Sequence, residues 1–260
     1  MDNVNKTLYI PLYGKAYVSQ RRILLEDPKA EEIWNSAGFP LKGKAKSKWL
    51  AYNMGMRGAI FDRWALRQMK ELPDAVVLHM GCGLDSRNLR IGNGEHPWFD
   101  VDFPEVIAER KRHFAETENY RMIASDIRKA EWLLQIPKEK TGIILMEGVS
   151  MYLKPEECRE VLKRWKDHFA QVRILLDSYT VFAAKATKYK NPINEVGVTA
   201  VYGVDDPCDL MADTGLTFLK EHSLTPEEMI AQLPNREQCF FKMMFAGKLA
   251  KKIYRLYEFR

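Results

Sequence analysis

AVVLHMGCGLDSRNLRI, residues 75–91, and WFDVDFPEV, residues 98–106, are the stretches that decide the fold of this chain. The apolar run 76–80 predicts a strand that is covered on both faces, with His79 as its one polar member. Gly81 and Gly83 then let the backbone turn tightly and approach a ligand closely. Asp102 follows about 20 residues after Gly81, where a carboxylate can accept hydrogen bonds from both hydroxyls of a ribose. These features predict an α/β unit that binds a nucleoside.

The residues that are missing narrow the choice of nucleoside. A dinucleotide site favours G-x-G-x-x-G, but here Ser86 stands at the third glycine position. No G-x-x-x-x-G-K-[ST] string occurs, so the usual cradle for a nucleoside triphosphate is absent from the sequence. A nucleoside without phosphates fits better, and S-adenosylmethionine is the common one.

Acidic residues follow several further predicted strands. Asp126 comes after a third apolar run in YRMIASDIR, Glu147 ends a fourth strand at 143–146, and Asp177 lies at the end of a fifth in VRILLDSY. Any one of these acids is more readily explained as a helix cap or turn residue. Because ligands of open parallel sheets bind outside the carboxyl ends of the strands, Asp102, Asp126 and Glu147 in series indicate one shared site.

The motifs GCGLDSR, DVDFPEV, SDIR and EGVSMYL resemble those of class I S-adenosylmethionine-dependent methyltransferases. The similarity is to the leucine carboxyl methyltransferase and polyketide O-methyltransferase (tetracenomycin TcmP-like) family. It extends over nearly the whole chain, including PLYGKAYVSQRRILLEDPKA near the start, MRGAIFD, and NPINEVG with YGVDDPCDL late on. The bacterial small-molecule branch resembles this chain more than the branch that methylates a protein phosphatase tail.

The resemblance implies a set of cofactor-binding residues: Lys15, Arg57, Gly81, Cys82, Gly83, Asp102, Phe103, Asp126, Ile127, Glu147 and Gly148. In that set Lys15 and Arg57 would hold the methionine carboxylate, a role that suits a guanidinium fork. Asp102 would take the ribose, Asp126 the adenine, and Glu147 would lie near the positively charged amino and sulfonium groups.

The acceptor pocket is expected among aromatic and polar residues. The resemblance places Tyr152 toward the acceptor, although a half-buried packing role explains a tyrosine there equally well. The segment 179–215 lacks sustained periodicity and is expected to form a lid insertion. Its residues Tyr179, Asn191 and Tyr202 are expected near the acceptor, unless the segment is a plain surface excursion.

The fold class expected is α/β, a seven-stranded, mostly parallel Rossmann-like methyltransferase sheet with helices on both faces. One domain spans 1–260, with an N-terminal helical cap at 1–70, a cofactor-binding core at 71–178, the lid insertion, and C-terminal strands and helices at 216–260. Helices are predicted at 57–72, 105–117 and 239–252, Pro226 is expected to open another, and TFLKEHSL and IYRLYEF are predicted as the last two strands.

Composition limits the partners. The chain of 260 residues is 46% apolar, but no run approaches the roughly 20 apolar residues of a membrane span. The N-terminus lacks an apolar signal core, and four cysteines show neither C-x-x-C pairs nor metal spacing, so we expect a cytoplasmic protein with reduced thiols and no metal site. The net charge of +5 concentrates at 42–48 and 242–260, without a nucleic-acid-binding motif. This charge is read as solvated surface that helps attract an anionic small-molecule acceptor.

Methyl transfer from a sulfonium is an in-line displacement that depends mainly on positioning and on the exclusion of water. A carboxylate acceptor needs no base, whereas a phenol benefits from one, and no catalytic residue can be assigned. The leading hypothesis is an O-methyltransferase that acts on a carboxylate or phenol of a small metabolite. The alternatives are a protein carboxyl methyltransferase acting on a C-terminal tail, a cofactor-binding protein without transfer activity and, more remotely, a nicotinamide oxidoreductase. The oligomeric state is left open.

Overall fold

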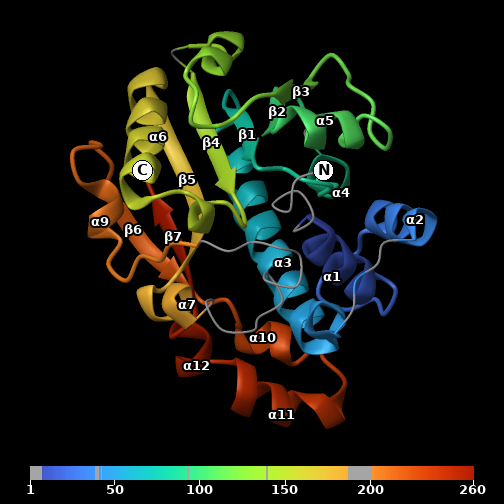
Figure 1. Ribbon diagram of the computed structural model, residues 1–260. Coiled ribbons are helices and arrows are strands. Elements are labelled where there is room, and N and C mark those ends of the chain that lie inside the picture. The colour runs from blue at the N-terminus through green and yellow to red at the C-terminus, as the bar shows by residue number, and fades with distance from the viewer. Residues whose placement is uncertain (1–7, 39–40, 42, 93, 139, 187–200) are drawn as a thin grey trace.

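The central element is a seven-stranded sheet with the order β3-β2-β1-β4-β5-β7-β6 (Figure 1). The computed structural model describes residues 8–38, 41, 43–92, 94–138, 140–186 and 201–260. The strands are β1 (Val76–Met80), β2 (Trp98–Asp102), β3 (Tyr120–Ala124), β4 (Thr141–Met146), β5 (Gln171–Tyr179), β6 (Phe218–His222) and β7 (Tyr254–Phe259). The first five pair in parallel, while β7 runs antiparallel to both β5 and β6. This confirms the predicted sheet of seven mostly parallel strands.

Both faces of the sheet are buried, as the near-continuous apolar strands predict. On one face Val77 belongs to the same core cluster as Phe61 of the long helix α3 (Lys48–Glu71). On the other face the next residue, Leu78, shares a cluster with Trp165 of α6 (Pro155–His168). The alternation of neighbouring strand residues between the two clusters follows from the two-residue period of a strand.

Three helices and a 3-10 turn of the described ranges precede the sheet. They are α1 (Tyr9–Ser19), α2 (Pro28–Ala37), η2 (Gly43–Lys46) and α3. The prediction that α3 begins at 57 was wrong, because Ser47 caps the helix by accepting a hydrogen bond from the Trp49 amide at 3.3 Å. Ala45 is buried within η2, so the basic stretch 42–48 is in part a packed turn.

The remaining helices in the described ranges are mostly short. They are α4 (Arg87–Arg90), α5 (Pro104–Arg110), α7 (Val181–Ala186), α9 (Cys208–Met211), α10 (Glu227–Ile230), α11 (Asn235–Phe245) and α12 (Lys248–Lys251), with 3-10 turns η3 (Glu131–Gln135) and η4 (Ser150–Tyr152). The helix predicted at 105–117 ends at Arg110, since Thr117 turns back to form a bridge with Tyr120. The helix predicted at 239–252 is two helices, because Gly247 adopts a φ of +59° between them. Pro226 caps α10, as predicted.

The carboxyl ends of the parallel strands β1 to β5 meet at one edge of the sheet, and α1 and α3 lie beside that edge (Figure 1). This arrangement positions the residues that follow each strand around a common space. None of the helices in the described ranges is both long and apolar enough to cross a membrane.

Candidate active site

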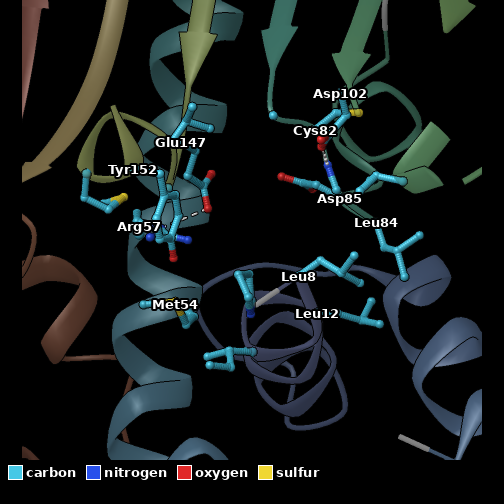
Figure 2. Close-up of a pocket in the computed structure, with 18 of the residues that line it drawn as sticks. Leu8, Leu12, Met54, Arg57, Cys82, Leu84, Asp85, Asp102, Glu147 and Tyr152 are labelled. Atoms are coloured by element: carbon cyan, nitrogen blue, oxygen red, sulfur yellow. Dashed lines mark hydrogen bonds and ion pairs between the residues drawn. The ribbon is translucent and has the colours of Figure 1, made fainter. Parts of the chain in front are cut away.

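A cavity of about 600 Å³ lies at the carboxyl ends of the strands. Its walls come from α1, α3, the segments after β1 to β4, the end of β5, α7 and the start of β7. Figure 2 shows Arg57 and Glu147 on one side of this space and Cys82 and Asp102 on the other. Among the lining residues are all those predicted to bind the cofactor: Lys15, Arg57, Gly81, Cys82, Gly83, Asp102, Phe103, Asp126, Ile127, Glu147 and Gly148. The structure therefore brings together residues that lie as far apart as 133 positions in the chain, in one space.

The bend after β1 requires glycine at its first position. Gly81 has a φ of +62°, and a Cβ placed there would come within 2.2 Å of Cγ2 of Val149. The next residue, Cys82, is buried, and its burial raises the pKa of the thiol well above the usual value, so it is a neutral group. The backbone at Gly81 therefore lies directly against the side chain of Val149 in the loop after β4, and the space between them holds no further side chain.

Asp102, at the end of β2, organises the floor of the cavity. Its carboxylate accepts hydrogen bonds from the amide of Gly83 at 2.8 Å and from its neighbour's amide, Phe103, at 2.7 Å. Burial raises the pKa of Asp102 to about 6, while these two amide donors oppose that rise. The carboxylate oxygens retain acceptor capacity, since each can accept more than one hydrogen bond.

Asp126, after β3, is a half-buried residue of the cavity lining. Its carboxylate accepts hydrogen bonds from the backbone amide of Arg128 at 2.9 Å and from the Arg128 Nε at 3.0 Å. Partial burial would raise the pKa of Asp126, but the hydrogen bonds from Arg128 outweigh it and lower the pKa. Ile127, between the two, is buried in the cavity wall and supplies an apolar surface there.

Glu147, at the end of β4, sits among basic side chains. Its Oε1 lies 3.0 Å from Nε of Arg57 and 3.3 Å from Nζ of Lys15, and its Oε2 accepts from Nη2 of Arg87. Burial would raise the pKa of Glu147, yet the charges of Lys15, Arg87 and Arg57 lower it far below its usual range. Glu147 is therefore a fixed negative charge that faces the cavity.

A buried ion-pair cluster supports this wall, and it was not predicted from the sequence. Arg87 is fully buried and pairs with Asp62 at 2.7 Å, with Asp85 at 3.2 Å and with Glu147. Arg90, one turn further along the helix, pairs with Asp62 at 2.7 Å and Asp85 at 3.1 Å. The cluster fixes α4 to α3 beneath the bend after β1.

His79 within β1 belongs to the same buried cluster. Its Nε2 lies 3.0 Å from Nη1 of Arg87, which can only donate, so this ring nitrogen accepts and the imidazole is neutral. Burial lowers the pKa of His79, which keeps it neutral. Among the described residues His79 is the histidine that lines the cavity, and its ring is already engaged by protein groups.

The tyrosines expected near the acceptor lie in different places. Tyr152 and Tyr179 line the cavity, whereas Tyr202 is beside the wall, where its amide donates to the carbonyl of Met151 at 2.8 Å. Asn191 lies outside the described residues. The expected lid at 179–215 begins with helix α7, which was not predicted, and its function as a lid stays a prediction.

Large apolar side chains also line the cavity. They include Leu50, Met54, Met151, Phe182 and Ile253, together with the tyrosine rings. Phe182 is 67% exposed and Ile253 is 50% exposed, so two of these side chains stand where the cavity meets solvent. The lining of the cavity therefore combines charged residues at the strand ends with large apolar residues.

Comparisons with known proteins agree with this architecture. The sequence profile of the leucine carboxyl methyltransferase family matches residues 10–166. The tetracenomycin polyketide synthesis O-methyltransferase TcmP of Streptomyces glaucescens is 30% identical over 234 residues, which are 89% of this chain and 87% of that protein. The S-adenosyl-L-methionine-dependent methyltransferase dpfgK of Gibberella zeae is 28% identical over 151 residues, 52% of this chain and 50% of that protein.

Solved structures share the fold at low sequence identity. The magnesium protoporphyrin IX methyltransferase ChlM from Synechocystis PCC 6803, with bound SAH, superposes with a TM-score of 0.52 at 13% identity, over 90% of this chain and 99% of that chain. The plantazolicin methyltransferase BamL gives a TM-score of 0.51 at 11% identity, over 78% of this chain and 83% of that chain. With the profile match, the full-length relative and this fold in agreement, the chain belongs to the leucine carboxyl methyltransferase family and is an S-adenosylmethionine-dependent methyltransferase.

Proposed function

We propose that this enzyme transfers the methyl group of S-adenosylmethionine to an oxygen of a small, largely apolar acceptor held in the cavity described above. The observation that carries the proposal is that one cavity is lined both by charged residues at the strand ends and by large apolar side chains, Phe182 of α7 among them. A volume of about 600 Å³ is within the range of pockets that enclose small ligands.

The charged residues at the strand ends, with Arg57 of α3, fit the cofactor chemically. The Nη2 of Arg57 has no acceptor within hydrogen-bond distance among the described residues, although the side chain is only 6% exposed. A carboxylate is the natural partner for such a buried donor. Asp102 offers acceptors for hydroxyl groups, and Glu147 offers a negative charge to an amino or sulfonium group.

In this proposal Lys15 and Arg57 hold the cofactor carboxylate, Asp102 the ribose, and Asp126 with Ile127 the adenine. The bound cofactor supplies an electrophilic methyl group on a sulfonium. The protein's own contribution is to orient the acceptor oxygen and to keep water away from it. The apolar residues that line the cavity favour the exclusion of water.

The acceptor is proposed to carry an ionised or readily ionised oxygen on an apolar body. The histidine that lines the described part of the cavity is engaged by protein groups, so it supports no role as a base toward a phenol of ordinary pKa. A carboxylate or an acidic phenol reacts without such a base. The apolar wall, with Phe182 and Ile253 at its edge, supports an uncharged remainder.

The four cysteines support action in a reducing compartment such as the cytoplasm. All are free thiols, and Cys82 and Cys158 are buried.

A panel of hydrophobic carboxylic acids and phenols, incubated with the enzyme and S-adenosylmethionine, tests the proposal by release of S-adenosylhomocysteine. The matched methyl esters and methyl ethers are the controls, because they present the same body without a free oxygen. We expect turnover with a member of the panel and none with its methylated control. Turnover confined to peptides with a free C-terminal carboxylate would instead establish a protein carboxyl methyltransferase and overturn the small-molecule assignment.

A further inference from the structure

Arg57 contacts two residues of the sheet, Tyr254 of β7 and Asp177 of β5. The hydroxyl of Tyr254, at the start of β7, accepts a hydrogen bond from Nη1 of Arg57 at 2.6 Å and donates one to Oδ2 of Asp177 at 2.7 Å. Asp177 is completely buried on β5, and Tyr254 is only 8% exposed. Arg57 and Tyr254 line the cavity, whereas Asp177 lies behind them.

Asp177 also contacts the loop after β4. Its second oxygen, Oδ1, accepts from the amide of Gly148 at 2.7 Å. Gly148 directly follows Glu147, whose Oε1 accepts a hydrogen bond from Nε of Arg57 at 3.0 Å. The Asp177 carboxylate therefore holds both the loop after β4 and the guanidinium group of Arg57. It reaches Arg57 through the Tyr254 hydroxyl and also directly, since its Oδ2 lies 3.4 Å from Nη1.

These contacts determine which part of Arg57 is available to a ligand. Nε is bound by Glu147 and Nη1 by Tyr254, so Nη2 is the nitrogen left without an acceptor among the described residues. A planar guanidinium that is held at two of its nitrogens cannot rotate without losing both hydrogen bonds. The direction of the remaining donors is therefore fixed by groups on β4 and β7.

We propose that Tyr254 and Asp177 are positioning residues that orient Arg57 toward the carboxylate end of the cofactor. This inference rests on the proposed role of Arg57 in the function above. It assigns the antiparallel strand β7, which lies outside the segment 10–166 matched by the family profile, a direct part in building the cofactor site. Preorganisation of this kind lowers the cost of ordering a binding group when the ligand arrives.

The test compares Tyr254→Phe with Tyr257→Phe by calorimetric titration. Tyr257 is the matched control because it is on the same strand, buried on the opposite face of the sheet, where its hydroxyl donates to the carbonyl of Asp205 at 3.2 Å. The two probes are S-adenosylhomocysteine, which has the amino-acid carboxylate, and adenosine, which lacks it. A purely structural defect would weaken both ligands together.

We expect Tyr254→Phe to weaken S-adenosylhomocysteine binding about tenfold, the size of one hydrogen bond to a charged group, and to leave adenosine binding within about twofold. Tyr257→Phe is expected to bind both ligands as the wild type does. Asp177→Asn is the second variant, for which the same selective loss is expected, and it keeps the question answerable if Tyr254→Phe does not fold.

Unchanged S-adenosylhomocysteine binding in Tyr254→Phe, or an equal loss for both ligands, would overturn the inference while the proposed function stands. Failure of the wild type to bind S-adenosylhomocysteine would overturn the proposed function itself. The two failures are therefore distinguished by the wild-type titration alone.

Discussion

Replacing Asp102 by alanine tests the proposed ribose contact at the atom where it is made. In the described structure the carboxylate accepts from two backbone amides, at 2.8 and 2.7 Å, and Asp102 lines the cavity. Loss of hydrogen bonds from two ligand hydroxyls to this acceptor is expected to cost about 1 to 3 kcal/mol. That free energy corresponds to a dissociation constant about 5 to 150 times larger.

The effect on folding is expected to be smaller. Alanine leaves two amides without their acceptor, but it also removes a carboxylate whose burial raises its pKa to about 6, which is itself unfavourable for the folded state. Thermal unfolding of Asp102→Ala therefore separates a folding defect from a binding defect. Asp74→Ala, at an exposed acid before β1, is the matched control.

Calorimetry with adenosine and with 2′,3′-dideoxyadenosine provides the assay. The dideoxy compound lacks both ribose hydroxyls, so it is expected to bind the wild type and Asp102→Ala with similar affinity, while adenosine distinguishes them. Should the variant weaken both nucleosides equally, Asp102 would act on the shape of the site and the reasoning about the ribose would be refuted.

Three further results are expected. Gly81→Ala places a Cβ 2.2 Å from Cγ2 of Val149 and is expected to weaken S-adenosylhomocysteine binding at least about tenfold. Gly92 also has a positive φ but open space around it, so Gly92→Ala is expected to keep the wild-type affinity. Equal affinities of the two variants in calorimetry would contradict this. Arg87→Met removes an ion-pair partner of the buried carboxylates of Asp62 and Glu147 and is expected to lower the free energy of unfolding by about 3 to 5 kcal/mol in urea titrations. A loss below about 1 kcal/mol would show that the buried ion pairs of Arg87 do not stabilise the fold. Ligand hydroxyls favour the ionised form of Asp102, whose pKa burial raises to about 6, so S-adenosylhomocysteine binding is expected to weaken about tenfold from pH 7 to pH 5. If Asp102→Asn showed the same loss of affinity between these two pH values, another acid would be responsible for the pH dependence.

The strand-end residues could be predicted because their positions depend on local pattern. The runs that form β1 to β4 are followed by a glycine or lie beside an acidic residue, and the parallel arrangement of these strands brings Gly81, Asp102, Asp126 and Glu147 to one edge. Most of the seven strands followed from such apolar runs. The helix limits were less well predicted, because a cap such as Ser47 acts through one side chain rather than through a periodic pattern.

The buried charges could not be predicted in this way. Asp62, Arg87 and Arg90 have the composition of a solvated helix surface, and only the packing of α3 against α4 places them together in the interior. Tyr254 and Asp177 are 77 residues apart and meet because β7 inserts antiparallel beside β5, a non-local pairing that no spacing rule specifies. Such contacts depend on the order of strands in the sheet, which the residues of one strand do not encode.

A crystal structure of the enzyme with S-adenosylhomocysteine tests the central claim most directly. The account predicts the nucleoside across the Gly81 bend, with its ribose hydroxyls on Asp102, its adenine beside Asp126, and its carboxylate on Arg57. A ligand found outside this cavity, or bound within it without contact to Asp102 and Arg57, would contradict the account.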